Sequence, residues 1–234
     1  MPNRQRSLPP QPQVWIVVSM SETHNHGGTG TTVEFWENFY QEREQVWSGS
    51  PNFLLVREVE SAPAGTALDL GCAEGADAIW LAERGWRVTA VDVSETALGR
   101  AKARAAELGI TGIEWQRHDL ADSFPAGRFD LVTAQYLHSP VAQADEREKI
   151  LRRAAEAVAP GGQLLIVGHA EWPSWVETPP HDVHFPSTAE VRAGLDLDPA
   201  EWTVEAEGLA EREHAGPEGQ PGTRKDNVLR LRRR

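Results

Sequence analysis

Cysteine is almost absent from this sequence of 234 residues: Cys72 is the only one, so no internal disulfide can form. A chain without disulfides suits a reducing compartment, and a cytoplasmic location is the expectation. Long hydrophobic runs are absent too. The longest one near the amino terminus, Val14 to Val18, falls well short of the roughly 20 residues that span a bilayer, and no convincing cleavage site follows it. Neither a membrane span nor a secretory signal is therefore expected.

Basic residues are scarce as well, with 23 Lys and Arg against 35 Asp and Glu, for a net charge of −12. Nucleic-acid binding needs clustered basic side chains, so no nucleic-acid partner is expected. The exception is an arginine cluster at positions 230, 232, 233 and 234, which fits either an RNA- or membrane-binding tail or the exposed face of a final strand. The acidic character of the rest of the chain favours the strand. The oligomeric state stays open.

Residues 1–32 contain several prolines and glycines but no sustained hydrophobic period, which is typical of a disordered tail. Met20 is a candidate for the true start of the protein. From Val33 the pattern changes, because apolar residues recur at helical spacing through Tyr40. A loop at 47–52 and a second helix from Phe53 follow. We expect one domain over 33–234, whose first part, 33–62, forms two N-terminal helices.

Strands and helices alternate after Pro63. Apolar strands are predicted at 67–70, 88–91, 113–116, 130–134 and 164–167, with helices at 76–84, 95–108 and 144–158. Ser94 is expected to cap the helix 95–108, Leu108 to lie in its buried stripe, and Pro160-Gly161-Gly162 to form a turn. The alternation predicts an α/β fold with a mostly parallel sheet and helices on both faces. A helix at 188–195 and two strand-like runs, 203–206 and 227–231, break the alternation and predict an antiparallel pair at the sheet edge.

The first predicted strand ends in Asp69-Leu70-Gly71-Cys72-Ala73-Glu74-Gly75-Ala76-Asp77. Glycines let the backbone take positive φ and pass close to a ligand, and the helix that follows presents unpaired N–H groups. The second strand ends in Asp92, 17 residues after Gly75, where a carboxylate can accept both hydrogen bonds of a ribose diol. The sequence therefore predicts a nucleoside pocket at these strand ends, although the pattern also fits a strand-turn-helix that binds no ligand.

The spacing and charge of this loop discriminate between two nucleoside cofactors. A dinucleotide site normally reads G-x-G-x-x-G, whereas the glycines here are Gly71-x-x-x-Gly75. Asp69 would repel a pyrophosphate, but it suits a ligand that carries an ammonium and a sulfonium, as S-adenosylmethionine (SAM) does. SAM is therefore favoured over NAD, and an NAD-linked oxidoreductase is the alternative.

The run DLGCAEGADAIWLAERGWRVTAVDVSETAL resembles the core of class I SAM-dependent methyltransferases, most of all small bacterial members related to the tellurite-resistance and thiopurine methyltransferases. The resemblance extends over roughly residues 33–234. It implies a Rossmann-like, seven-stranded, mostly parallel sheet with an antiparallel last strand, SAM as the cofactor, and a lid made by the helices of 33–62. The family more often has glycine where Ala73 stands.

The resemblance also implies which residues bind SAM. Asp92 is implied to bind the ribose and His118-Asp119 to meet the adenine amino group, although Asp is also common in turns. Trp36 and Tyr40 fit either core packing or a ligand contact, and Trp47, in a loop, favours the pocket. The implied cofactor-binding residues are Asp69, Gly71, Ala73, Gly75, Asp92, Val93, His118, Asp119, Leu120, Ala134, Gln135, Trp36, Tyr40 and Trp47.

Methyl transfer from a sulfonium is an in-line displacement in which positioning supplies much of the acceleration. The expected acceptor is a small molecule with a sulfur, selenium, tellurium or oxygen nucleophile, and only a nucleophile that keeps its proton requires a base. His138 and His169 follow the fourth and fifth predicted strands. They are the candidate catalytic bases, or else polar residues at the rim of the pocket.

Other chemistries are not favoured. His181-x-x-His184 lacks the third and fourth ligands of a metal site, so no metal is expected and this loop is interpreted as shaping the substrate pocket. Cys72 has no evident base beside it, which argues against a catalytic thiol. The segment Ala134 to His138 differs from the Asn-Pro-Pro-Tyr pattern of DNA amino-methyltransferases. A non-catalytic SAM-binding module and a protein substrate remain open alternatives.

Overall fold

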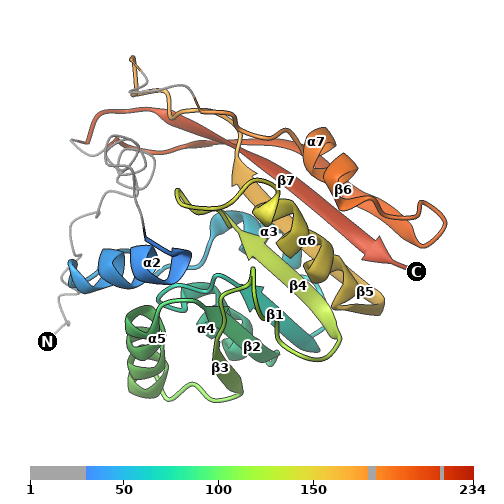
Figure 1. The fold of residues 1–234 in the computed structure, drawn as a ribbon, viewed down its shortest axis with the longest axis horizontal. Helices are drawn as coiled ribbons and strands as arrows, with labels where there is room; N and C mark the ends of the chain where they lie inside the picture. The colour runs from blue at the N-terminus through green and yellow to red at the C-terminus, as the bar shows by residue number, and fades with distance from the viewer. Residues whose placement is uncertain (1–29, 179–182, 217–218) are drawn as a thin grey trace, which may run out of the picture.

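The computed structural model describes residues 30–178, 183–216 and 219–234, so most of the predicted tail lies outside the described residues. Seven strands form one sheet in the order β3-β2-β1-β4-β5-β7-β6 (Figure 1). The strands are β1 (Thr66–Leu70), β2 (Arg87–Asp92), β3 (Ile113–Arg117), β4 (Phe129–Gln135), β5 (Val158–His169), β6 (Trp202–Glu213) and β7 (Thr223–Arg233). β1 to β5 pair in parallel, whereas β7 is antiparallel to both β5 and β6. The predicted Rossmann-like α/β fold with an antiparallel last strand is confirmed.

Six helices in the described part of the chain accompany the sheet. They are α2 (Thr32–Gln41), α3 (Phe53–Val59), α4 (Ala76–Glu83), α5 (Glu95–Glu107), α6 (Glu146–Glu156) and α7 (Thr188–Leu195). One core cluster joins Leu68 and Leu70 of β1 to residues of α6 and α7, and a second joins Ala67 of the same strand to α3 and α4. Because successive side chains of a strand point to opposite faces, helices cover both faces of the sheet, as predicted.

Helix starts follow the capping chemistry of the sequence. The Ser94 hydroxyl accepts a hydrogen bond from the Ala97 N–H at 3.1 Å, so it caps α5 as predicted. Thr31 and Glu34 form a reciprocal capping box at the start of α2, a signal that the sequence reading passed over. Figure 1 shows α2 beside α5, on the side of the molecule toward which the arrows of β4 and β5 point. The N-terminal helix is thereby placed at the carboxyl ends of the parallel strands.

Three local predictions were wrong or too short. β5 runs through Pro160-Gly161-Gly162, where a turn was expected, and its register with β4 shifts at this point. Gly162 packs tightly here, since a Cβ on it would lie 2.9 Å from the Phe129 carbonyl oxygen. Leu108 caps the end of α5 and is 52% exposed rather than buried. β6 and β7 extend well beyond the predicted runs 203–206 and 227–231, because their outer parts consist mostly of polar and charged residues.

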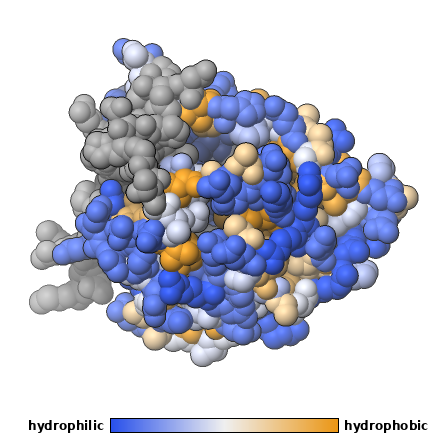
Figure 2. Space-filling model, viewed as in Figure 1, coloured by the Kyte–Doolittle hydropathy of each residue, from blue (hydrophilic) through white to orange (hydrophobic). Residues whose placement is uncertain are grey.

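The surface is mainly polar. The described part of the face in Figure 2 carries mostly hydrophilic residues, with hydrophobic ones in small separate groups. Phe53, Leu108, Val204 and Leu209 are the large hydrophobic residues classed as exposed among those described. None of the described helices has the length and apolar character that a membrane crossing requires.

Candidate functional site

A cavity of about 220 Å³ opens at the carboxyl ends of β1 and β4. The strand order reverses between these two strands, and ligands of open α/β sheets bind at such a switch point. The wall of the cavity includes every site residue predicted from the sequence except Ala134. Ala134 is fully buried in the core cluster that contains residues of α6, whereas the next residue of β4, Gln135, lines the cavity. One cavity therefore brings together residues spread over most of the chain.

The turn after β1 depends on its glycines. Gly71 and Gly75 have φ values of +70° and +81°, in the left-handed region that favours glycine. A Cβ on Gly75 would also lie 2.8 Å from the Cβ of Ala101. Ala73 takes a φ of +50°, and its N–H donates to Oδ2 of Asp92 at 2.8 Å. This bond ties the glycine loop to the end of β2.

Buried carboxylates crowd the end of the cavity beside this loop. Asp69 is 2% exposed, and its Oδ2 has no hydrogen-bond partner among the described residues. Burial, together with the nearby charges of Asp77 and Asp92, raises the pKa of Asp69 well above its usual value. Asp77 accepts two hydrogen bonds of 2.6 Å from Asn52, and Asp92 accepts from the Ser94 N–H at 2.9 Å. Asp69 therefore differs from Asp77 and Asp92 in keeping an acceptor oxygen that no described residue uses.

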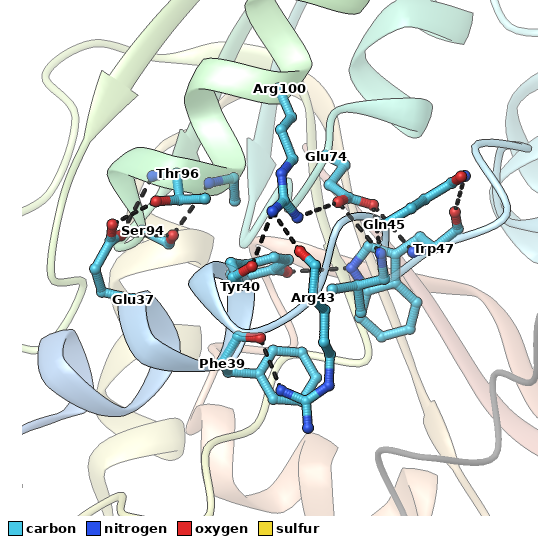
Figure 3. Close-up of polar contacts among 12 residues, drawn as sticks. Glu37, Phe39, Tyr40, Arg43, Gln45, Trp47, Glu74, Ser94, Thr96 and Arg100 are labelled. Carbon is cyan, nitrogen blue, oxygen red and sulfur yellow. Dashed lines mark hydrogen bonds and ion pairs between the residues drawn. The ribbon is translucent and has the colours of Figure 1, made fainter.

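The N-terminal helix is fastened to the cofactor half of the sheet. Glu37 of α2 accepts hydrogen bonds from the Ser94 hydroxyl at 2.8 Å and from the Thr96 hydroxyl and N–H at 2.5 and 3.2 Å (Figure 3). Burial alone would raise the pKa of Glu37, but these donors outweigh it and lower the pKa to about 2. A charged carboxylate also suits the positive N-terminus of α5. α2 is thus held in place by a side chain that stays ionised at neutral pH.

Arg100 of α5 fastens the segment that follows α2. Its guanidinium forms an ion pair of 2.9 Å with Glu74 of the glycine loop and donates to the carbonyl oxygens of Tyr40, at 2.9 Å, and of Arg43. Glu74 in turn accepts from the Trp47 N–H at 3.0 Å. Figure 3 shows the side chains of Arg100 and Glu74 pointing toward each other, with the carbonyl oxygens of Tyr40 and Arg43 beside the Arg100 guanidinium. The segment and the glycine loop therefore share one hydrogen-bond network.

Aromatic side chains of the N-terminal segment both pack together and line the cavity. Phe39 and Tyr40 form a small core cluster with Ala97, against which Trp36 and Trp47 pack. Trp47 Nε1 donates to the Tyr40 hydroxyl at 3.1 Å. Burial and the charge of Asp92 raise the pKa of Tyr40 well above its usual value. The two interpretations of these aromatics, core packing and pocket lining, are both compatible with the structure.

The predicted adenine-binding residues lie along the same cavity. His118, Asp119, Leu120 and Val93 all line it. The ring of His118 contacts the Ser123 hydroxyl at 2.8 Å and the Gln116 amide oxygen at 3.0 Å. Asp119 accepts from the Ala121 N–H at 3.1 Å, as a turn-capping residue does.

At its other end the cavity is lined by His138, His169, Tyr136 and two arginines, Arg212 and Arg224. The rings of Tyr136 and His169 lie 4.5 Å apart between centroids, and those of His138 and His169 lie 6.0 Å apart. The sequence reading missed both arginines. They stand in the polar parts of β6 and β7, and only the pairing of these strands brings them to the ends of β4 and β5.

Both histidines are neutral at pH 7. Burial and the neighbouring His169 and Arg147 lower the pKa of His138 to about 3. Burial also lowers the pKa of His169, although a hydrogen bond of 3.1 Å between its Nδ1 and Asp226 opposes the shift. Asp226 is fully buried and also pairs with Arg212 at 3.4 Å. It too was missed, since nothing in the sequence links it to His169.

Two further sequence observations have structural outcomes. His181 lies outside the described residues, and His184 is exposed, with its Nε2 3.1 Å from Glu190. Cys72 is buried within the glycine loop. Burial and the charges of Asp92 and Asp69 raise the pKa of its thiol, so that it stays protonated.

Comparisons with known proteins agree with this geometry. A family model described as a methyltransferase domain matches residues 67–162. The 2-heptyl-1-hydroxyquinolin-4(1H)-one methyltransferase of Mycobacteroides abscessus is 31% identical over 174 residues, which are 70% of this chain and 75% of that protein. Ribosomal RNA small subunit methyltransferase C of Chromohalobacter salexigens is 30% identical over 120 residues, 49% of this chain and 35% of that protein.

Among solved structures, TehB from Haemophilus influenzae matches 85% of this chain and 67% of its own, with a TM-score of 0.60 and 17% identity, which shows a shared fold. The Mycobacteroides abscessus enzyme is similar over most of both chains, and the domain match covers the glycine loop, β2 to β4 and the beginning of β5. This protein belongs to the class I SAM-dependent methyltransferases.

Proposed function

We propose that this enzyme transfers the methyl group of SAM to a small molecule through a sulfur, selenium, tellurium or oxygen nucleophile. The observation that carries the proposal is one continuous cavity that joins the acidic end at the glycine loop to the histidines at the ends of β4 and β5. Methyl transfer requires donor and acceptor in line at contact distance. A cavity that holds both meets this requirement.

The acidic end fits the amino-acid and ribose parts of SAM. The unpartnered oxygen of Asp69 is suited to accept from the SAM ammonium group, because a bound cation favours the ionised form of this buried carboxyl. Asp92 is proposed to accept from the ribose, and its bonds to Ala73 and Ser94 fix its orientation. His118 and Asp119 are proposed to meet the adenine. Bound SAM supplies an electrophilic methyl group on a sulfonium.

The N-terminal segment is proposed to act as a lid. Trp36, Tyr40 and Trp47 line the cavity from this segment, and Arg100 and Glu74 connect the segment to the residues that would hold SAM. Large aromatic side chains exclude water, which strengthens the electrostatic contacts inside. The role assigned to residues 33–62 is thus to close the donor end.

A small acceptor is supported by the relative from Mycobacteroides abscessus, which is named for a small heteroaromatic substrate. The similarity to the ribosomal RNA methyltransferase covers only 35% of that protein, and a net charge of −12 opposes RNA binding. His138 and His169 are proposed to contact the acceptor, with either as the base when the nucleophile carries a proton. The single buried cysteine supports a cytoplasmic location.

Calorimetry tests the donor site. SAM and S-adenosylhomocysteine (SAH) are expected to bind the wild type, while NAD does not, and Asp92→Ala is expected to weaken SAM binding by at least tenfold. The matched control is Asp122→Ala, which removes an exposed aspartate away from the cavity.

SAH release is then measured with a panel of thiols, selenite, tellurite and acidic hydroxyl compounds. Binding of NAD, or undiminished SAM binding by Asp92→Ala, would contradict the proposed donor site.

A further inference from the structure

Two arginines face each other across the last two strands. Arg212 of β6 and Arg224 of β7 are direct partners in the antiparallel ladder, and both line the cavity. Like charges at directly opposite positions destabilise a sheet. Arg147 of α6 lines the same cavity. The acceptor end thus concentrates positive charge in a protein whose net charge is strongly negative.

Little negative charge compensates these arginines. Asp226 pairs with Arg212 at 3.4 Å, but it also bonds His169, and it does not itself line the cavity. Arg224 is only 5% exposed, and its Nη2 contacts the ring nitrogens of His169 at 3.2 and 3.4 Å. Among the described residues, no carboxylate stands at ion-pair distance from Arg224. Its charge is therefore buried beside a neutral ring.

The surroundings of Arg224 disfavour its charged form. Burial, and the charge of Arg212, lower the pKa of Arg224, although Asp226 acts in the opposite direction. Arg147 has its pKa lowered by burial too, and its Nε donates to the Leu137 carbonyl oxygen at 2.9 Å. Glu146 also lines the cavity, but it accepts from the Gln143 N–H at 3.0 Å at the start of its own helix. A buried cation without a counter-charge is costly, and a ligand of opposite charge removes that cost.

We propose that the methyl acceptor binds as an anion, with its charge held between Arg212 and Arg224. Guanidinium groups bind carboxylates and similar oxyanions through paired N–H donors, and they also donate charge-assisted hydrogen bonds to an ionised hydroxyl, thiol or selenol. Ser139, whose buried hydroxyl has no hydrogen-bond partner in the described part of the chain, lines the same cavity and adds a donor. The inference rests on the proposed function in one respect, namely that the bound anion is the acceptor.

An anionic acceptor also makes a base unnecessary, which is compatible with the lowered pKa values of His138 and His169. A lone pair of the acceptor forms the new bond to the methyl carbon, and the carbon–sulfur bond breaks with its electron pair passing to sulfur. Neutral SAH leaves, and the negative charge of the acceptor is consumed. No proton has to be moved, so the reaction requires no base of ordinary pKa.

The anion site is tested without turnover, by thermal unfolding of the SAH-loaded protein with benzoate or with its neutral analogue benzamide. At ten times its Kd, benzoate is expected to raise the Tm by about 3–6 °C, and benzamide is not. Arg212→Met and Arg224→Met are expected to abolish the rise, whereas Arg224→Lys retains part of it. The control is Arg192→Met, which removes an arginine of α7 that does not line the cavity and pairs with Glu207 at the surface.

The outcomes separate this inference from the proposed function. Equal effects of benzoate and benzamide, including no effect of either, would overturn the anion site, as would a benzoate effect that persists in Arg224→Met. If Arg224→Met does not fold, Arg212→Met and Arg224→Lys decide the question. Failure to bind SAH would overturn the proposed function, while the benzoate comparison on the unloaded protein still decides the anion site. For an ionised acceptor that is methylated, Arg224→Met is expected to lower kcat/KM at least tenfold and to change the Kd of SAH less than twofold.

Discussion

Two buried aspartates, one at each end of the cavity, have opposite surroundings. Asp69 at the donor end has an oxygen without a partner, and burial with two neighbouring carboxylates raises its pKa. Asp226 at the acceptor end is fully buried, yet its bonds to His169 and Arg212 and the charge of Arg224 outweigh burial and lower its pKa. Two aspartates of similar burial are thus expected to have opposite effects on stability: Asp69 destabilises the folded protein, and Asp226 stabilises it. The proposed donor end therefore concentrates carboxylates, whereas the proposed acceptor end concentrates arginines.

The largest expected effect is on stability at the acceptor end. Asp226→Asn removes the negative charge between His169 and Arg212 and leaves buried arginines uncompensated, so the free energy of unfolding is expected to fall by about 3 kcal/mol. Urea unfolding measures the change. The control Asp122→Asn is expected to change stability by less than about 0.5 kcal/mol. If Asp226→Asn is as stable as the wild type, Asp226 is not the counter-charge of this end.

Asp69→Asn is expected to act in the opposite direction on the fold. Without a buried, partnerless carboxylate, the unloaded protein is expected to gain stability of about 0.5–2 kcal/mol. SAM binding is expected to weaken about 10–100-fold, because a charged hydrogen bond is replaced by a neutral one. Urea unfolding and calorimetry on the same preparation give both values. A loss of stability together with unchanged SAM affinity would remove the contrast between the two aspartates.

The pH dependence of stability separates the same pair by sign. Because the folded-state pKa of Asp226 is lowered, its contribution is present above the unfolded pKa and is lost as pH falls through the folded pKa. The raised pKa of Asp69 has the reverse effect, so stability declines as pH rises from 3.8 through the folded value. Urea unfolding of the wild type and both Asn variants between pH 3 and 8 is the measurement. As the pH falls, the loss of unfolding free energy caused by Asp226→Asn should become smaller. As the pH rises, the gain of unfolding free energy caused by Asp69→Asn should become larger. If both variants changed the unfolding free energy in the same direction, both assignments would be contradicted.

The smallest expected effect concerns the lid. Arg100→Met removes the bonds to the carbonyl oxygens of Tyr40 and Arg43 and to Glu74. SAH binding is expected to weaken about threefold to tenfold, since hydrogen bonds to a charged group contribute about 1.5–3 kcal/mol and part of this stabilises the lid itself. Lys102→Met, on the exposed face of the same helix, is the control. A change in the benzoate response of Arg100→Met would show that the lid serves both ends rather than the donor end.

The donor end was predictable because its residues are close in sequence. Asp69, the glycine loop and Asp92 occur within one strand-turn-helix-strand unit, so spacing and charge sufficed to identify a nucleoside pocket and to favour SAM over NAD. Ala134 does not line the cavity, because side chains alternate along β4 and that of Ala134 points into the core instead. The resemblance to the family gave its position in the sequence but not the side of the strand on which it lies.

The acceptor end was not predictable for a geometric reason. Arg212 and Arg224 are 12 positions apart, and only the register of β6 with β7 makes them neighbours. That register is fixed by pairing with β5, which places Asp226 opposite His169. In the sequence, Arg212, Arg224 and Asp226 are charged residues that lie outside the short apolar runs from which the last two strands were predicted. Local patterns that reveal a glycine loop contain no such long-range information.

The position of β7 has a consequence for how such enzymes diversify. β7 is inserted between β5 and β6, so β6 is joined to the sheet only through β7. Arg212, Arg224 and Asp226 all belong to this hairpin, whereas the glycine loop and the residues proposed to hold SAM belong to the other half of the sheet. If the proposed roles hold, exchange of this one hairpin changes the charge at the acceptor end and leaves the residues proposed to hold SAM unchanged.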